Sequence, residues 1–479
     1  MSPTPKSRPS SHQAKADIQA QSVGEQLQHD AEAVGAEIQH EADVIKSRVV
    51  DNQNRFNRFL RILGPGLITG AADDDPSGIA TYSQAGAQFG LHMAWVLWFT
   101  LPMQVAVQEA CARIGAVTGK GLATIIREHY SRPVLYFAVG LTVTANLINI
   151  GADIGAMGAA VQLLFPQLPF VAITLAFTIM VLLLEIFTSY RTYAKLLKWL
   201  ALALIAYPIT AFIAGLNWSE VIHYSLVPHI DFSPAFLFII VGVLGTTISP
   251  YLFFWQTSEL VEEEVAEHRL AQRGGVPRLS NSFLRKMRID NFVGMLFSAL
   301  AAWFIIITAA GVLNAHGITN IATSADAAKA LEPLVQGFPA AGLIAKLIFA
   351  IGIIGLGLLA VPVLAGSSAY AFCGAFGWHE GLYRKLRKAQ TFYGMIAVAT
   401  LAGLLFNFSG VDPIKALVYT AVFNGLAAVP LLFLISRIAK NPAVMGQHVS
   451  GRLSRFFVMV AFLLMAIAAI AMFLTLGQA

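Results

Sequence analysis

The sequence predicts an all-α polytopic membrane protein with 11 transmembrane helices. Of its 479 residues, 56% are hydrophobic and only 12% are charged. Apolar stretches of about 20 residues, the length that crosses a bilayer as a helix, recur along most of the chain. The basic residues are concentrated in the short segments between these stretches, whereas a soluble protein of this size would carry far more charge on its surface. The formal net charge of +5 therefore indicates no nucleic-acid partner, and we expect the lipid bilayer to surround the chain.

The eleven predicted spans are separated by loops whose charge alternates. We place the spans at residues 60–89, 92–117, 133–164, 168–188, 193–215, 234–262, 288–313, 339–374, 391–408, 412–437 and 454–477. Lys and Arg are plentiful in every second loop, for example at 113–132 and 269–288, and nearly absent from the loops between them. Because basic loops stay in the cytoplasm, the alternation predicts a cell (inner) membrane protein with a cytoplasmic N-terminus and an outside C-terminus.

An odd number of spans fits two five-helix halves of opposite orientation followed by one extra helix. Residues 1–56 are polar and lack an apolar core, so we expect a cytosolic, partly amphipathic tail and no cleavable signal peptide. Residues 57–479 then form the transmembrane domain. Within it we expect a first repeat at about 60–215, a second repeat at about 234–437 and the extra helix at 454–477.

The first span contains an interruption that points to function. Asp73, Asp74 and Asp75 stand in its middle and are followed by Pro76 and Gly78. An Asp at mid-membrane depth costs about 2.5–3.5 kcal/mol on insertion scales, so such residues are rare and usually functional. Pro and Gly break the helix, and the carbonyls they free survive at that depth only where they line a cavity or bind an ion. We therefore predict a discontinuous helix with a cation site at the break.

The sixth span repeats this feature. Residues 235–260 hold a group of small and hydroxyl residues, ending in Pro250, in the middle of an apolar run. If the halves are inverted repeats, the sixth helix corresponds to the first. Two interrupted helices at corresponding positions indicate a substrate site at the bilayer midplane.

Two motifs resemble a known family. GPGLITGAADDDPSG (64–78) and ARIGAVTGKGLA (112–123) resemble the first helix and the end of the second helix of NRAMP divalent-metal transporters. The resemblance covers about residues 57–475 and implies a LeuT-like fold and passage of a divalent cation. Where the family typically has Asp-Pro-Gly-Asn, this chain has Asp75-Pro76-Ser77-Gly78. Where the family has Met-Pro-His, it has Ser249-Pro250-Tyr251.

These departures are most similar to the NRAMP-related magnesium transporters, a branch that carries Mg²⁺ and Mn²⁺. A thioether favours softer transition metals, whereas oxygen ligands suit Mg²⁺, Ca²⁺ and Mn²⁺. The family's proton-linked His is replaced by Tyr251, and of the usual acid pair in the third helix only Asp153 remains. We therefore expect a secondary transporter that imports Mg²⁺, with Mn²⁺ also accepted, by alternating access without tight proton coupling. The alternative is a proton-coupled Mn²⁺/Fe²⁺ importer.

Asp75 is the expected metal ligand, with a helix-capping carboxylate as the alternative. The other candidates are polar or backbone groups at the breaks or on facing helices: Gly78, Asp153, Thr246, Thr247, Ser249, Tyr251, Gln256 and Asn424. Small hydroxyl and amide residues also serve as packing contacts between membrane helices, so that role stays open for them. Asp73 and Asp74 cannot share the direction of Asp75, because successive helical residues are about 100° apart.

Other classes of protein are disfavoured. The eleven histidines lie in tails and loops, and no nucleophile–base pair stands in the spans, so we expect no enzyme and no cofactor. A channel and an organic-substrate carrier remain alternatives. Glu109 and Arg113, four residues apart, predict a structural ion pair. The sequence leaves the oligomeric state open and is compatible with a monomer.

Overall fold

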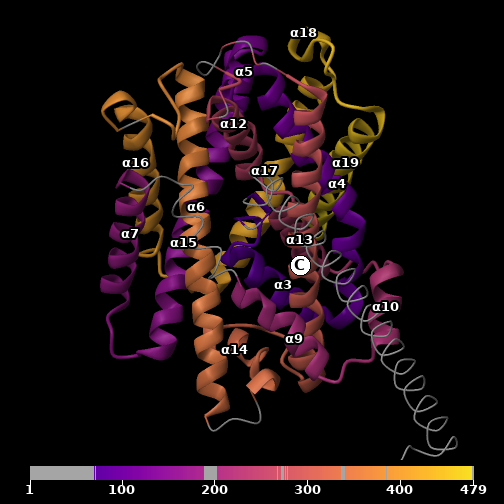
Figure 1. The fold of residues 1–479 in the computed structure, drawn as a ribbon. Helices are drawn as coiled ribbons and strands as arrows, with labels where there is room; N and C mark the ends of the chain where they lie inside the picture. Colours follow the sequence, from indigo (N-terminus) through magenta and orange to yellow (C-terminus); the bar gives the residue numbers. More distant parts are fainter. Residues whose placement is uncertain are drawn as a thin grey trace, which may run out of the picture. The chain divides into compact units, whose positions relative to one another are not determined.

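The helices follow the predicted spans closely. The computed structural model of the chain describes residues 69–70, 72–187, 202–266, 268–270, 275, 277, 279–335, 340–384 and 386–476. The predicted tail at 1–56 lies outside the described residues. The α-helices, labelled in Figure 1, are α3 (Pro76–Phe89), α4 (Trp95–Thr118), α5 (Leu122–His129), α6 (Arg132–Leu164), α7 (Phe170–Phe187), α9 (Ala206–Ile213), α10 (Trp218–Leu226), α11 (Pro234–Thr247), α12 (Pro250–Ala266), α13 (Asn281–Val312), α14 (Ser324–Lys329), α15 (Ala341–Phe376), α16 (Gln390–Phe406), α17 (Pro413–Ala439), α18 (Pro442–Met445) and α19 (Arg452–Leu476). Within these ranges the chain has no strand.

Six of the described helices, and α11 with α12 taken together, are long and apolar enough to cross a membrane, which gives seven spans. The number is eight if α3 and α4, bent by 106° at their junction, count as one span. The remaining predicted spans correspond to shorter helices such as α16, or fall partly on residues 188–201, outside the described part. The count of eleven therefore stays a prediction, while the all-helical membrane architecture is confirmed.

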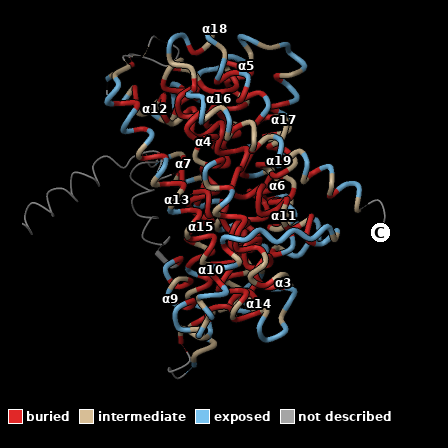
Figure 2. The backbone as a smooth tube through the Cα atoms, turned by 90° about the vertical axis from the view of Figure 1, so that its right-hand side faces the viewer, coloured by how far each residue is buried: buried red, intermediate tan, exposed pale blue. Residues whose placement is uncertain are grey.

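The helices form two neighbouring groups with α3 between them. In Figure 1, α6, α7, α15 and α16 gather on one side of α3, and α4, α13 and α19 on the other, while α17 lies centrally and contacts α6 as well as α19. Buried residues run through the middle of the helix bundle, as Figure 2 shows in red. The exposed surface of α7 and α19 is apolar, with outward-facing Leu175, Ile179, Leu183, Ile467 and Leu474. A surface of this kind suits lipid, because apolar side chains in water would be disfavoured.

Both predicted interruptions are present. Residues 69, 70, 72 and 73 are helical, Asp74 and Asp75 are not, and α3 then begins at Pro76. The second break lies between α11, which ends at Thr247, and α12, which begins at Pro250. At each break a proline opens the new helix, since its fixed φ and missing N–H suit the first helical position.

Candidate metal-binding site

Asp75 caps α3. Its Oδ1 accepts hydrogen bonds from the Ser77 hydroxyl (2.6 Å) and the Gly78 backbone N–H (2.8 Å). The backbone of Asp75 is extended, as expected of a residue just before a helix, and Pro76 follows it. The capping role held open for this carboxylate is therefore present. It leaves acceptor capacity for a cation, because each carboxylate oxygen has two lone pairs.

The other oxygen of Asp75 faces α6. The Asn149 side-chain amide donates to Asp75 Oδ2 at 2.8 Å, while its own oxygen, Oδ1, is buried with no hydrogen-bond partner. Asp153 lies one turn further along α6, is fully buried, and has no partner for either carboxylate oxygen. The α6 side of the break thus offers unpaired oxygens of two kinds, an amide and a carboxylate.

The two breaks meet at Gly78. A Cβ added to this glycine would lie 3.1 Å from the Thr246 hydroxyl oxygen and 3.2 Å from the Tyr82 ring. The first break therefore contacts the end of α11 directly, and the absence of a side chain at Gly78 permits that contact. No such pairing of residues 168 positions apart is visible in the sequence.

At the second break, the hydroxyl groups of Thr247, Ser249 and Tyr251 are hydrogen-bonded to carbonyls, whereas the buried Thr246 hydroxyl has no hydrogen-bond partner. Thr247 donates to the Val243 carbonyl (2.9 Å), and Ser249 donates to the Thr246 carbonyl (2.8 Å). Tyr251 donates to the Ala72 carbonyl at 2.8 Å and so ties α12 to the residues just before the first break. A hydroxyl that donates its hydrogen keeps its oxygen lone pairs, so these groups remain possible oxygen ligands or carbonyl organisers.

Two predicted site residues lie apart from Asp75 in their contacts. Gln256 Oε1 accepts a hydrogen bond from the Thr69 hydroxyl, which places it against the helical residues before the break. Asn424 is buried on α17 with no partner for its amide. Its neighbour Gly425 lies against α11 at Gly245, so Asn424 stands beside the second broken helix.

Asp73 and Asp74 face away from α6. Asp73 contacts Gln104 of α4, and both carboxylates contact Ser298 of α13. In the described part of the chain, no three His, Cys, Asp or Glu side chains are grouped as metal ligands. A cation at either side of the break would therefore bind one or two carboxylates together with amide, hydroxyl and carbonyl oxygens.

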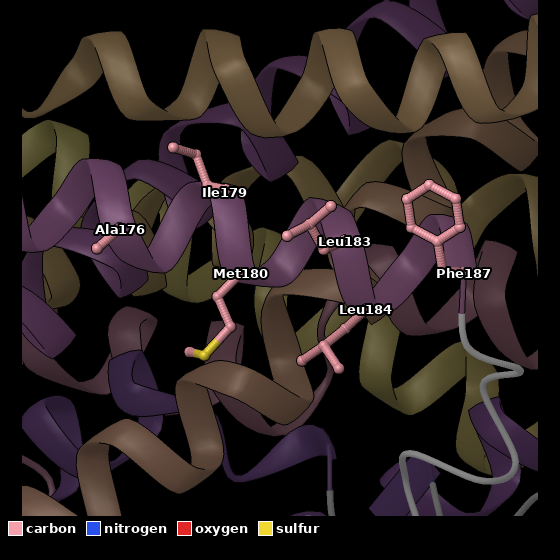
Figure 3. A pocket seen from close by; sticks show the side chains of 6 residues that line it. All are labelled: Ala176, Ile179, Met180, Leu183, Leu184 and Phe187. Carbon is pink, nitrogen blue, oxygen red and sulfur yellow. The ribbon is translucent and has the colours of Figure 1, made fainter.

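A hollow on the surface of α7 is separate from these groups. Figure 3 shows its lining of Ala176, Ile179, Met180, Leu183, Leu184 and Phe187. These side chains offer hydrocarbon and one thioether, with no oxygen ligand for a cation. The hollow fits an apolar chain of a lipid better than an ion, and it shares no residue with the two breaks.

Comparisons with known proteins agree with this geometry. The family described as Nramp, "Natural resistance-associated macrophage protein-like", matches residues 66–475. The chain is 26% identical over 452 residues to the divalent metal cation transporter MntH of Caldanaerobacter subterraneus, covering 90% of this chain and 99% of the relative. The manganese transporter of Eremococcus coleocola superposes with a TM-score of 0.66 at 18% identity, covering 87% of each chain. The structure of MhsT with L-phenylalanine superposes at 0.59 with 14% identity, covering 86% of this chain and 98% of the other.

Proposed function

Because the chain belongs to the Nramp family of membrane transporters and is not an enzyme, we propose that it imports divalent cations, Mg²⁺ with Mn²⁺ also accepted, by alternating access. The named relatives, a divalent metal cation transporter and a manganese transporter, support the cation class. Their LeuT-like fold and the broken helices at residues 74–75 and 248–249 support alternating access around a midplane site.

The observation that carries the preference for Mg²⁺ is the chemistry of the groups at the two breaks. Asp75, Asn149, Asp153 and Thr246 offer oxygen atoms, and Ser249 stands where the family has a thioether. Soft sulfur ligands select transition metals, whereas an all-oxygen set accepts Mg²⁺. Without the sulfur, the site has no means of rejecting the more abundant hard ion.

The residue at position 78 supports an ion that keeps part of its hydration. The family's Asn is absent here, so one protein ligand is missing from the break. Mg²⁺ dehydrates reluctantly and usually binds through one or two carboxylates and several waters. Asp153 and Asn149, one turn apart on α6, are suited to bind such waters, because their oxygens are buried and lack partners.

Transport without tight proton coupling is part of the proposal. Tyr251 stands at the position of the family's proton-linked His, and its hydroxyl is bonded to the Ala72 carbonyl. An inside-negative potential of 100 mV favours entry by about 2.3 kcal/mol per charge, or about 4.6 kcal/mol for a divalent ion. This driving force suffices for the divalent ion to accumulate inside the cell. The loop charges favour an orientation of the protein with its N-terminal tail in the cytoplasm.

The second candidate is a proton-coupled Mn²⁺/Fe²⁺ importer. The names of the relatives favour it, since both refer to transition-metal or general divalent-metal transport. The two candidates differ in two measurable respects, namely whether Mg²⁺ competes and whether protons accompany the metal.

Uptake by the purified protein in liposomes tests the proposal. We expect millimolar Mg²⁺ to inhibit Mn²⁺ uptake, Mg²⁺ itself to be transported, and the lumenal pH to stay constant. Asp75→Asn should weaken metal binding by at least about 100-fold, since loss of an outer-shell partner alone costs 10–100-fold. Asn caps helices as well as Asp does, so the fold should persist. The matched control is Asp412→Asn, at the cap of α17.

The opposite result is equally clear. If millimolar Mg²⁺ neither inhibits Mn²⁺ uptake nor enters the liposomes, and uptake acidifies the lumen, the chain is a proton-coupled transition-metal importer. If Asp412→Asn lowers binding as much as Asp75→Asn, Asp75 is not a ligand.

A further inference from the structure

We propose that a second divalent-cation site lies on the opposite side of the first break, formed by Asp73, Asp74, Gln104 and Ser298. The proposed function supplies only the route by which a cation reaches this place. The binding itself does not involve Asp75.

One hydroxyl group joins the two carboxylates. Ser298 Oγ of α13 lies 2.8 Å from Asp73 Oδ2 and 3.2 Å from Asp74 Oδ1. The Gln104 amide of α4 donates to Asp73 Oδ2 at 2.5 Å. The side chains of three separate elements therefore converge, and all four residues are at most 1% exposed.

The surrounding backbone holds this arrangement closely. A Cβ added to Gly70 would lie 2.3 Å from the Gly294 carbonyl oxygen, so the start of the first helix touches the backbone of α13. Ser298 is one turn beyond Gly294 on the same helix. Close contact of the two backbones thus brings the Ser298 hydroxyl to the acids, and it leaves little freedom for the carboxylates to turn away.

The side-chain amide of Gln104 also has an oxygen without a hydrogen-bond partner, which is an observation independent of the two acids. Its Nε2 donates to Asp73, while its Oε1 is buried with no hydrogen-bond partner. The flipped orientation of the Gln104 amide would place its oxygen against the Asp73 carboxylate, so the hydrogen-bond network favours the orientation in which Nε2 faces Asp73. Asp73 Oδ1 and Asp74 Oδ2 are also buried without partners. Three buried oxygens from two elements therefore lack any donor, which is the condition that a cation would satisfy.

The charges identify the kind of ion. Within the described residues, neither Asp73 nor Asp74 forms an ion pair with a basic side chain. Two buried carboxylates with no basic partner are strongly disfavoured as anions unless a proton or a cation neutralises them. A divalent ion balances both charges, and two carboxylates with a neutral amide oxygen and water are typical ligands of Mg²⁺.

This site is distinct from that of Asp75. The oxygens of Asp75 contact α3 and Asn149 of α6, whereas Asp73 and Asp74 contact α4 and α13. The two places share one short segment of chain but no ligand. Ions at both would repel each other, so we expect the second ion to bind more weakly than the first.

Counting bound ions tests the proposal. The purified full chain in detergent is titrated with Mn²⁺ in choline chloride, and the free aquo-ion is measured by electron paramagnetic resonance. We expect two Mn²⁺ per chain, both displaced by Mg²⁺. The double substitution Asp73→Asn with Asp74→Asn should leave one bound Mn²⁺, at the Asp75 site. Asp75→Asn should leave one bound Mn²⁺, at the second site. All three substitutions together should leave no bound Mn²⁺. Thermal unfolding of each variant shows whether it is folded.

A gentler pair of variants keeps the test informative if the double variant fails to fold. Gln104→Leu should weaken binding of the second ion about 10-fold and leave the affinity for the first ion unchanged. Gln108→Leu, one turn further on α4 and equally buried with an unpartnered amide, should change neither. The proposal is wrong if the wild type binds one ion, if Gln108→Leu acts like Gln104→Leu, or if 150 mM Na⁺ but not Mg²⁺ displaces the second ion. Failure of the proposed function would appear differently, as two bound ions without Mg²⁺ transport.

Discussion

Asn149 donates a side-chain hydrogen bond to Asp75 at 2.8 Å and so joins α6 to the break in the first helix. The amide fixes the direction of Oδ2, while the same carboxylate holds α3 through Oδ1. A carboxylate held from both sides is preorganised, so binding a cation costs little additional ordering.

Removing this amide should weaken cation binding. Asn149→Ala leaves Asp75 Oδ2 without its donor and removes an unpartnered oxygen from the α6 side of the break. We expect about 10–100-fold weaker Mg²⁺ and Mn²⁺ binding, the usual effect of losing a partner that orients a ligand. Isothermal titration measures it. Asn146→Ala is the matched control, since that amide, one turn away, contacts Leu364 and Ser368 instead. Equal losses in both variants would contradict a specific role for Asn149.

Returning a thioether to the second break should change selectivity. The Ser249 hydroxyl donates to the Gly245 and Thr246 carbonyls at the end of α11, so Ser249→Met frees those carbonyls and adds a soft ligand. We expect Cd²⁺ and Mn²⁺ to gain affinity relative to Mg²⁺ by about 10-fold or more. Competition in an uptake assay gives the ratio. Ser436→Met, a buried serine of α17 with the same kind of back-bond, should leave it unchanged. A ratio unaffected by Ser249→Met would mean that position 249 does not contact the ion.

Acid should loosen α14, which lies outside the spans. Partial burial raises the pKa of Asp326, but hydrogen bonds from Lys329 and Thr323 outweigh it and hold that pKa below its ordinary value. A carboxylate whose folded pKa is depressed stabilises the fold above its unfolded pKa of about 3.9, and this contribution is lost as the pH falls through the folded value.

Hydrogen exchange tests this expectation. Amide exchange at 323–330, corrected for intrinsic rates, should accelerate as the pH falls from 5 to 3, and Asp326→Asn should remove most of that dependence. Glu332→Gln is the control, because Glu332 acts on Lys329 without taking part in the cap. A pH response that survives Asp326→Asn would contradict this role.

Local rules were enough to predict the two helix breaks. Pro76 and Pro250 each open a new helix, and the residues before them leave the helical conformation. The ion pair of Glu109 and Arg113 also follows from spacing alone and is confirmed. Such features depend on a few neighbouring residues, so no tertiary information is required.

Side-chain contacts between different helices could not be predicted from the sequence. The rotation of each helix decides that Asn149, 74 positions away, meets Asp75, and that Ser298 meets Asp73. The short helices were missed for another reason. α5 has only eight residues, too few for a hydropathy signal, although it buries Leu122, Ile125 and Ile126 at helical spacing.

The contact of α11 with α17 should tolerate no added atom at Gly245. A Cβ there would lie 2.1 Å from the Ala421 carbonyl oxygen and 2.3 Å from the Gly425 nitrogen, both of which are backbone atoms that cannot turn aside. Gly245→Ala should therefore separate the two helices, at a cost of about 1–3 kcal/mol or more.

The separation should also shift the adjacent Thr246 away from Gly78, so cation binding should weaken along with stability. Thermal unfolding in detergent and metal titration measure the two effects. Gly140→Ala is the matched control, because no atom lies within 4 Å of its added Cβ on α6. It should be neutral or stabilising by about 0.5–1 kcal/mol, since Ala suits a helix better than Gly. If the two variants unfold at the same temperature, the approach of α11 to α17 is looser than described, and the position of Thr246 beside the break cannot depend on it.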